Sequence, residues 1–219
     1  MATPRPFEPD TLRLRLRQLA YGLTAVMLAY VLYHNEHFLV DAADPGWPHY
    51  RDVARWLLPH GLVGALALLL SLMQFSTRLR QRFTRLHRVS GRVYVIAVFV
   101  LCPLGVRLGF LDEQIGYTAS FAVATIVFAA LWMFATGLAF WNIRRRRIEQ
   151  HRQWMTRSLA MAMVFLEVRV IGGLTGWEDS PAADTIIVWT CIAVAYPLAD
   201  LVLQIEDSLR SRMRPARTV

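Results

Sequence analysis

Two His-Arg pairs are the residues of this sequence best placed to do chemistry. His87-Arg88 and His151-Arg152 each follow an arginine-rich stretch and precede a long apolar run. Two imidazoles that face each other can ligate a haem iron axially, and arginine forks can hold the haem propionates. The alternative is that each His-Arg pair binds lipid phosphate at the edge of a membrane. These four residues therefore predict either a haem b site or a headgroup site.

A second group of histidines lies earlier in the chain. His34 and His37 in "YHNEHF" are three residues apart, so they would share one face of a helix. His60 in "WLLPHG" is expected at a similar depth, and Glu36 or Glu167 could assist these histidines. Three imidazoles at one level predict a transition-metal site on the outer face of the membrane. The alternative is that the histidines hydrogen-bond to loop backbone at the interface.

Charged side chains also occur inside apolar runs, where they are costly and usually functional. Arg107 and Arg169 lie toward the outer ends of their runs, and Asp200 lies toward the inner end of the last run. The two arginines could flank one anionic ligand, such as a lipid phosphate or a cofactor carboxylate. Alternatively, Glu167 pairs with Arg107 and seals the helix bundle.

The apolar runs themselves predict an all-α membrane protein. The chain is 55% hydrophobic with a mean hydropathy of +0.35, and a spanning helix needs about 20 mostly apolar residues. Such runs are apolar on all sides, whereas the helices of a soluble protein should be amphipathic. We therefore expect a polytopic protein with six transmembrane helices, at roughly 19–40, 57–75, 93–111, 119–142, 158–174 and 185–205.

The arginines predict how these helices are oriented. There are 24 arginines and no lysine, and 20 of the arginines fall in the segments 1–18, 76–92, 143–157 and 206–219. Because cytoplasmic segments carry the excess of positive charge, these four segments and both termini are expected in the cytoplasm. The predicted organisation is a basic N-terminal segment (1–18), a single transmembrane domain (19–205) and a basic tail (206–219).

An internal repeat relates the two His-Arg pairs. The stretch "LSLMQFSTRLRQRFTRLHRVSGRVYV" resembles "ATGLAFWNIRRRRIEQHRQWMTRSLAMA", because each passes from a span through an arginine-rich turn to His-Arg and the next span. Spans 2–5 would then form an internally duplicated four-helix bundle, with its halves related by an axis along the membrane normal. That symmetry would bring His87 and His151 close together. The alternative is a chance similarity between two basic loops.

Four stretches carry a resemblance to a known family. "PHGLVGALALLLSLMQF", "LHRVSGRVYV", "HRQWMTRSLAMA" and "EVRVIGG" resemble the bacterial predicted membrane proteins of the domain of unknown function 2306, over roughly residues 20–205. This resemblance implies a bacterial inner-membrane protein without a defined activity. Separately, "LHRVSGRVYV" is similar to the histidine-bearing segment of ferric-reductase-like and b-type transmembrane cytochromes. Those proteins carry a second histidine about four turns further along the helix, where this chain has Leu101 and Val164, so the likeness implies one haem at most.

Three functions follow from these patterns. The first is an inner-membrane b-type cytochrome-like protein that passes electrons from a cytoplasmic or quinone donor to an outer acceptor. The second is a non-catalytic accessory protein, or a transport protein that binds lipids or small molecules. The third is a metal-dependent intramembrane hydrolase that uses the outer histidines. Nucleic-acid binding is not expected, because the basic residues stand where membrane orientation already requires them.

Overall fold

The computed structural model is an all-α bundle. It describes residues 9–34, 43, 51, 53–114, 118–177 and 180–211. Six of the helices in these residues are long and apolar enough to cross a membrane, and only the short α4 is not. The predicted all-α class with six spanning helices is therefore confirmed. The helices are α1 (Pro9–His34), α3 (Ala54–Gln74), α4 (Thr77–Arg82), α5 (Thr84–Gln114), α6 (Ala119–Arg144), α7 (Ile148–Thr175) and α8 (Pro181–Ser211).

The helices extend beyond the apolar runs that predicted them. α5 begins at Thr84 and α7 at Ile148, each about two to three turns before its apolar run. Arginine is a good helix former, and its long side chain can reach the aqueous boundary from a helix end. Helical hydrogen bonding therefore continues where the hydrophobic signal stops, and both His-Arg pairs lie on helices. The first predicted span runs to residue 40, but α1 ends at His34 and residues 35–40 lie outside the described residues.

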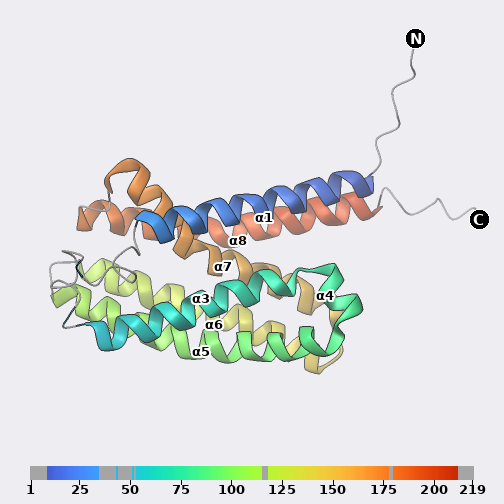
Figure 1. Ribbon diagram of the computed structural model, residues 1–219, viewed down its shortest axis with the longest axis horizontal. Helices are drawn as coiled ribbons and strands as arrows, with labels where there is room; N and C mark the ends of the chain where they lie inside the picture. Colours follow the sequence, from blue (N-terminus) through green and yellow to red (C-terminus); the bar gives the residue numbers. More distant parts are fainter. Residues whose placement is uncertain are drawn as a thin grey trace, which may run out of the picture.

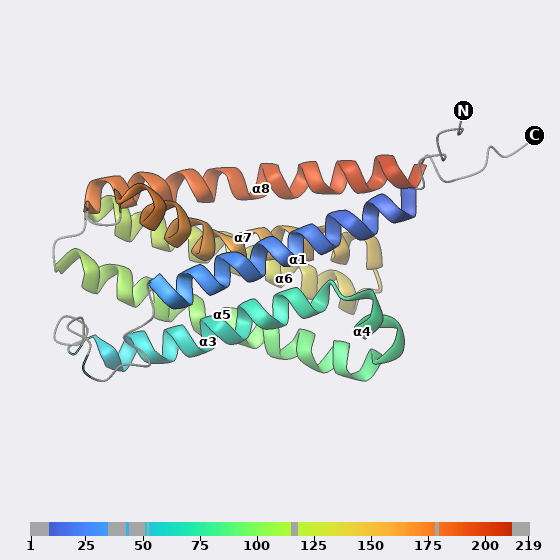
Figure 2. The same cartoon turned by 45° about the horizontal axis from the view of Figure 1, so that its top comes forward.

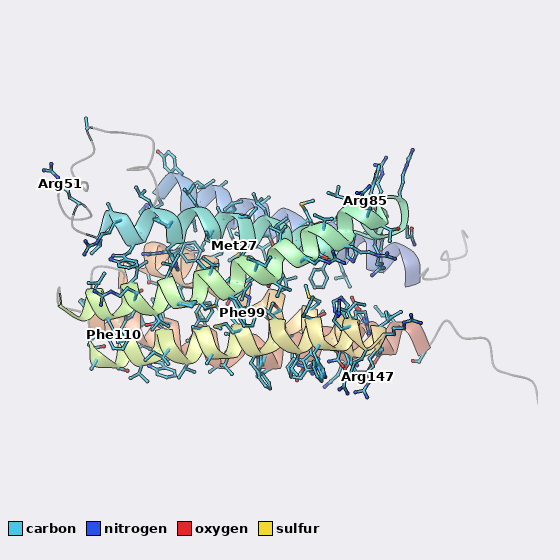
Figure 3. The ribbon with its side chains drawn as sticks, turned by 90° about the horizontal axis from the view of Figure 1, so that it is seen from below. Met27, Arg51, Arg85, Phe99, Phe110 and Arg147 are labelled. Atoms are coloured by element: carbon cyan, nitrogen blue, oxygen red, sulfur yellow. The ribbon has the colours of Figure 1, made fainter. Side chains whose placement is uncertain are left out.

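The basic segments gather at one end of the bundle (Figures 1 and 2). The start of α1, the helix α4, the turn between α6 and α7 and the end of α8 all lie there. Figure 3 shows Arg85 and Arg147 at this end, with Arg51 and Phe110 at the other. We call the two ends the basic end and the opposite end. The arrangement is the one that the predicted orientation requires, while the cytoplasmic location of the basic end stays a prediction.

Each long helix from α3 onward packs against the next one in the chain. α5 contacts both α3 and α6, and α7 contacts both α6 and α8. α1 packs on α7 and lies between α7 and α3 (Figure 2), where the Tyr21 hydroxyl donates to the carbonyl of Leu72 at 3.2 Å. The two predicted halves, α3–α5 and α6–α7, are thus two neighbouring helical hairpins, and their origin by duplication stays a prediction.

Small side chains fill the places where these helices meet. Without a hydrophobic driving force in lipid, close approach of helix backbones stabilises a bundle, and alanine allows it. Large apolar side chains such as Leu62, Ile96 and Phe134 instead remain exposed on the outside, as expected of a surface that lipid covers. The buried alanines include Ala67, Ala97, Ala122, Ala124, Ala129, Ala135, Ala139, Ala162, Ala195 and Ala199.

Candidate functional site at the basic end

His151 is held in the first turns of α7 by a contact to α6. Its backbone N–H donates to the carbonyl of Arg147 at 2.9 Å, and its ring Nδ1 lies 2.8 Å from the carbonyl oxygen of Ala139. A carbonyl only accepts, so Nδ1 carries the proton, and the neutral ring keeps the lone pair of Nε2. The fold therefore fixes the imidazole in one tautomer and leaves Nε2 for a ligand.

His87 occupies the corresponding place on α5. Ser76 caps α4 by accepting from the backbone N–H of Leu79 at 3.2 Å, and the chain leaves helical geometry at Phe83 before α5 begins. The backbone N–H of His87 donates to the carbonyl of Phe83 at 3.0 Å. Its ring is half-buried, and the buried Nδ1 has no hydrogen-bond partner in the described part of the chain. The elbow between α4 and α5 thus places a second imidazole at the start of a helix.

The two histidines are near enough to interact electrostatically. His87 interacts in the same way with Arg80 and Arg88. Neither arginine forms an ion pair with any described residue. Two imidazoles from α5 and α7 therefore lie beside uncompensated positive charge. Such a site suits a ligand that offers a metal centre, an anionic group or both.

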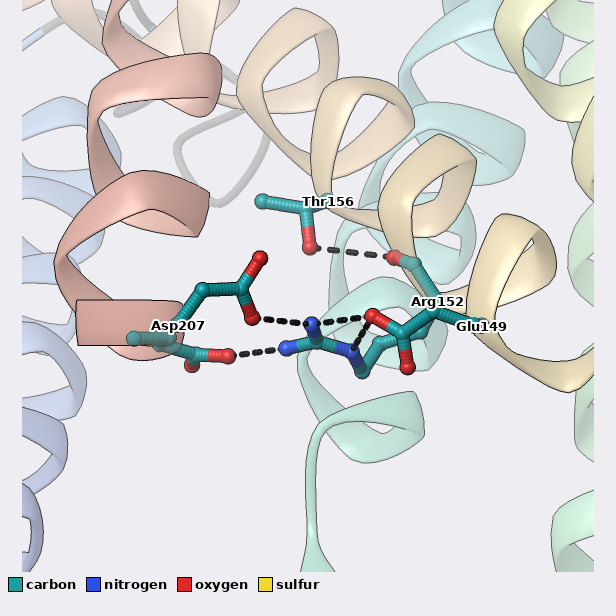
Figure 4. A network of polar contacts seen from close by, with 5 residues as sticks. Glu149, Arg152, Thr156 and Asp207 are labelled. Atoms are coloured by element: carbon teal, nitrogen blue, oxygen red, sulfur yellow. Dashed lines mark hydrogen bonds and ion pairs between the residues drawn. The ribbon is translucent and has the colours of Figure 1, made fainter. Parts of the chain in front are cut away.

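Arg152, the repeat partner of Arg88, has a different environment. Its guanidinium binds Glu149 on its own helix and both Glu206 and Asp207 on α8, with 3.1 Å to Asp207 (Figure 4). One and a half turns further along α7, Arg157 Nη2 lies 2.7 Å from Asp200 Oδ1. In this structure three carboxylates engage Arg152 and tie α7 to α8, while its predicted binding of a cofactor stays a prediction.

A buried hydrogen-bonded cluster lies two helical turns deeper than the histidines. The hydroxyls of Tyr94 and Ser158 are 2.6 Å apart, and those of Ser158 and Thr136 are 2.7 Å apart. Trp132 Nε1 donates to the Tyr94 hydroxyl at 3.1 Å. The exposed fraction of all four residues is 4% or less. This cluster links α5, α6 and α7 inside the apolar part of the bundle.

The sequence analysis missed this cluster, although the repeat contains the signal for it. Tyr94 follows His87 by seven residues, and Ser158 follows His151 by seven residues. Seven residues are close to two turns of an α-helix, so each polar residue shares a face with its histidine. Both residues lie within the two similar stretches, so aligning these stretches on their histidines pairs Tyr94 with Ser158.

The residues predicted to bind a metal lie at the opposite end. His34 packs on α7 at Gly173, where an added Cβ would lie 2.9 Å from its Nε2, and His60 packs on α5 at Gly105. Glu167 interacts with Cys191 of α8. No three His, Cys, Asp or Glu side chains of the described residues come together as a metal-binding group. The metal site stays a prediction, because its member His37 lies outside the described residues.

Arg107 and Arg169 also lie toward the opposite end, and each is close to an aromatic ring. The guanidinium carbon of Arg107 is 5.8 Å from the ring centroid of Trp56, and that of Arg169 is 5.8 Å from the ring of Phe165. The alternative pairing of Glu167 with Arg107 is not found among the ion pairs of the described residues. The intramembrane carboxylate that does have an arginine partner is Asp200.

Comparison with known proteins adds a family but no activity. A family model described as "Predicted membrane protein (DUF2306)" matches residues 57–203, from the first turn of α3 to α8. No curated protein and no solved structure matches the chain. The matched region contains both His-Arg pairs and the buried cluster, so function must be argued from these residues themselves.

Proposed function

The chain belongs to the DUF2306 family of predicted membrane proteins, and we propose that it is a b-type cytochrome-like protein of the bacterial inner membrane. In this proposal His87 and His151 hold one haem at the basic end. The observation that carries it is the bond from His151 Nδ1 to the carbonyl of Ala139, which leaves Nε2 free beside the second imidazole. Metal-bound histidines usually donate their other ring N–H in this way.

The chemistry of the donor set fits a haem. The imidazoles of His87 and His151, from two different helices, would hold the haem iron through their ring nitrogens. His87 Nδ1 is buried without a described partner, so His87 is not committed to another hydrogen bond at that atom. Arg80 and Arg88 supply positive charge for the propionates. When bound, the haem would supply one-electron transfer.

The other residues of the site orient the two imidazoles. Ala139 fixes the ring of His151, and the contact between Tyr94 and Ser158 holds α5 against α7 two turns deeper. Arg152 anchors α7 to α8 through three carboxylates, so Arg80 and Arg88 take the propionate role. A quinone or a cytoplasmic protein would deliver the electrons, and the predicted orientation puts the basic end on the cytoplasmic side.

The absorption spectrum of the purified protein tests this proposal. We expect a Soret band after expression with added haem precursor, and a pyridine haemochrome assay should give about one haem per chain. The double variant His87→Ala/His151→Ala should lose the band, whereas His34→Ala at the opposite end should keep it. The proposal fails if the wild type shows no Soret band, or if the double variant keeps a full one.

A second function is favoured by the surface of the α4–α5 elbow. A hollow of about 490 Å³ is lined by Arg82, Phe83, Thr84, Arg85, Leu86 and Val89. Exposed apolar side chains beside arginines suit a lipid acyl chain and its phosphate. This observation supports a non-catalytic, lipid-binding membrane protein. In that case the double histidine variant would leave the absorption spectrum unchanged, while Arg82→Gln/Arg85→Gln would lower the amount of co-purified lipid.

A further inference from the structure

Four arginines of this chain are not explained by its membrane orientation. Twenty of the 24 arginines lie in the basic segments, and the others are Arg51, Arg55, Arg107 and Arg169. Arg51 lies at the opposite end (Figure 3), Arg55 is in the first turn of α3, and the other two are in the outer halves of α5 and α7. The charge bias of membrane proteins disfavours arginine on this side. Membrane orientation does not account for these four arginines, so we expect them to have another role.

Two of these arginines meet at one ring of α3, and a third is near enough to interact with the same helix. The guanidinium carbons of Arg55 and Arg107 each lie 5.8 Å from the ring centroid of Trp56. His60 is four residues after Trp56, on the same helix face, and Arg169 interacts with it electrostatically. We call these five residues, contributed by α3, α5 and α7, the Trp56 cluster.

Two polar atoms in the Trp56 cluster are buried without a partner. Trp56 Nε1 and His60 Nδ1 have no hydrogen-bond partner in the part of the chain that the structure describes. An indole nitrogen can only donate a hydrogen bond, so Trp56 Nε1 requires an acceptor. A buried donor that stays unpaired costs the full free energy of its desolvation, so an acceptor that satisfies Trp56 Nε1 would be stabilised there.

Positive charge at the cluster is not neutralised by the protein. None of Arg55, Arg107 and Arg169 forms an ion pair with a described residue. The N-terminus of α3 points its positive dipole end to the same place, and its N-cap residue Val53 provides no side-chain cap. An indole N–H and arginine forks near one point match the oxygen atoms of an anion.

We propose that the Trp56 cluster binds a phosphate group at the opposite end of the bundle. The group would come from an anionic phospholipid or from free phosphate. Arg107 and Arg169 would bind its oxygens as forks, and Trp56 would donate one hydrogen bond from Nε1. The cluster lies near the ends of apolar helices, which is the depth of lipid headgroups. This site is separate from the histidine pair, and the proposal does not depend on whether the protein binds haem.

Binding of phosphatidylglycerol to the full-length protein in detergent tests the site, with native mass spectrometry as the readout. We expect Arg107→Gln/Arg169→Gln to weaken the specific binding about tenfold. Arg51→Gln removes one arginine at the same end outside the cluster, and we expect it to change binding by less than about twofold. Both variants retain the lipids that bind at the basic end. The difference in phosphatidylglycerol binding between the two variants therefore measures binding at the Trp56 cluster.

A second substitution keeps the test independent of folding defects. Trp56→Phe removes only the Nε1 donor and keeps an aromatic ring, and we expect it to weaken binding about fivefold. Trp177→Phe, at the same end but outside the cluster, is the matched control. Thermal melting with inorganic phosphate distinguishes the sources: protection that depends on Arg107 and Arg169 indicates free phosphate, and binding of phosphatidylglycerol alone indicates a lipid. Wild-type binding of both probes by Arg107→Gln/Arg169→Gln and by Trp56→Phe would overturn the proposal.

Discussion

At the basic end Arg152 and Arg157 form ion pairs with carboxylates of α8, whereas at the opposite end Arg107 and Arg169 lie near aromatic rings and pair with no described carboxylate. The same residue type therefore serves two purposes. At one end arginine joins helices. At the other end the arginines have no described carboxylate partner. A charge without a partner in a membrane costs free energy, and such charges usually belong to a binding site.

The comparison also shows why the position of an arginine in the sequence does not reveal its role. Arg88 and Arg152 hold matching places in the repeat, but among the described residues only Arg152 of the two meets acidic partners. Those partners come mainly from α8, which lies outside the repeat. A structural arginine becomes recognisable only when the neighbouring helix is known.

Removal of the ion pairs should produce the largest loss of stability. The side chains of Arg152 and Arg157 are 17% and 21% exposed, and their carboxylate partners are about half exposed. We expect Arg152→Gln/Arg157→Gln to lower the free energy of unfolding by about 2 to 3 kcal/mol, between the values for surface and buried pairs. Unfolding of the protein in mixed micelles by sodium dodecyl sulfate measures this change.

The matched double variant at the opposite end is Arg107→Gln/Arg169→Gln. It should cost less than about 1 kcal/mol, since it removes only cation–ring contacts at exposed sites. Equal losses for the two double variants would show that the arginines of both ends are structural.

Close packing replaces ion pairs where α1 meets α7. A Cβ at Gly173 would collide with the Tyr30 hydroxyl and lie 2.9 Å from His34 Nε2. We expect Gly173→Ala to destabilise the protein by about 2 kcal/mol, because α1 must move away. Gly22→Ala is the control on α1, since a Cβ there meets nothing within 4 Å, and it should be neutral or stabilising. Unfolding curves that coincide for the two variants would contradict this account of the α1–α7 contact.

The buried cluster between the two ends should have a smaller effect. Tyr94→Phe leaves Trp132 Nε1 without its acceptor and removes the bond to Ser158. We expect a loss of about 1 kcal/mol in the free energy of unfolding, the usual size for hydrogen bonds between helices in membranes. Tyr21→Phe is the exposed control, as Tyr21 bonds a single carbonyl on the outside of α3. If haem binds, Tyr94→Phe should also broaden the Soret band, because the two imidazoles are held less rigidly.

Much of the fold was predictable, because the membrane imposes strong rules. Six apolar runs gave six spanning helices, and the arginine pattern grouped the ends that the structure places together. The repeat predicted that His87 and His151 lie close, since equal offsets along two similar hairpins give equal depths. What the sequence could not give were contacts set by helix rotation. The partners of Arg152, the contact of His34 with Gly173 and the convergence on Trp56 depend on which faces of distant helices meet.

The last difference between the ends concerns the two turns with positive φ. At the opposite end Gly176 ends α7 with φ of 71°, while at the basic end Arg146 adopts φ of 61° in the turn between α6 and α7. This conformation costs an L-residue about 1 to 2 kcal/mol, and glycine nothing. Since glycine also makes the unfolded chain more flexible, we expect Arg146→Gly to stabilise the protein by only about 0.5 kcal/mol. Gly176→Ala should destabilise it by about 1 kcal/mol in the same unfolding assay. If Arg146→Gly lowers the stability, the Arg146 side chain stabilises the folded protein by more free energy than its backbone strain costs.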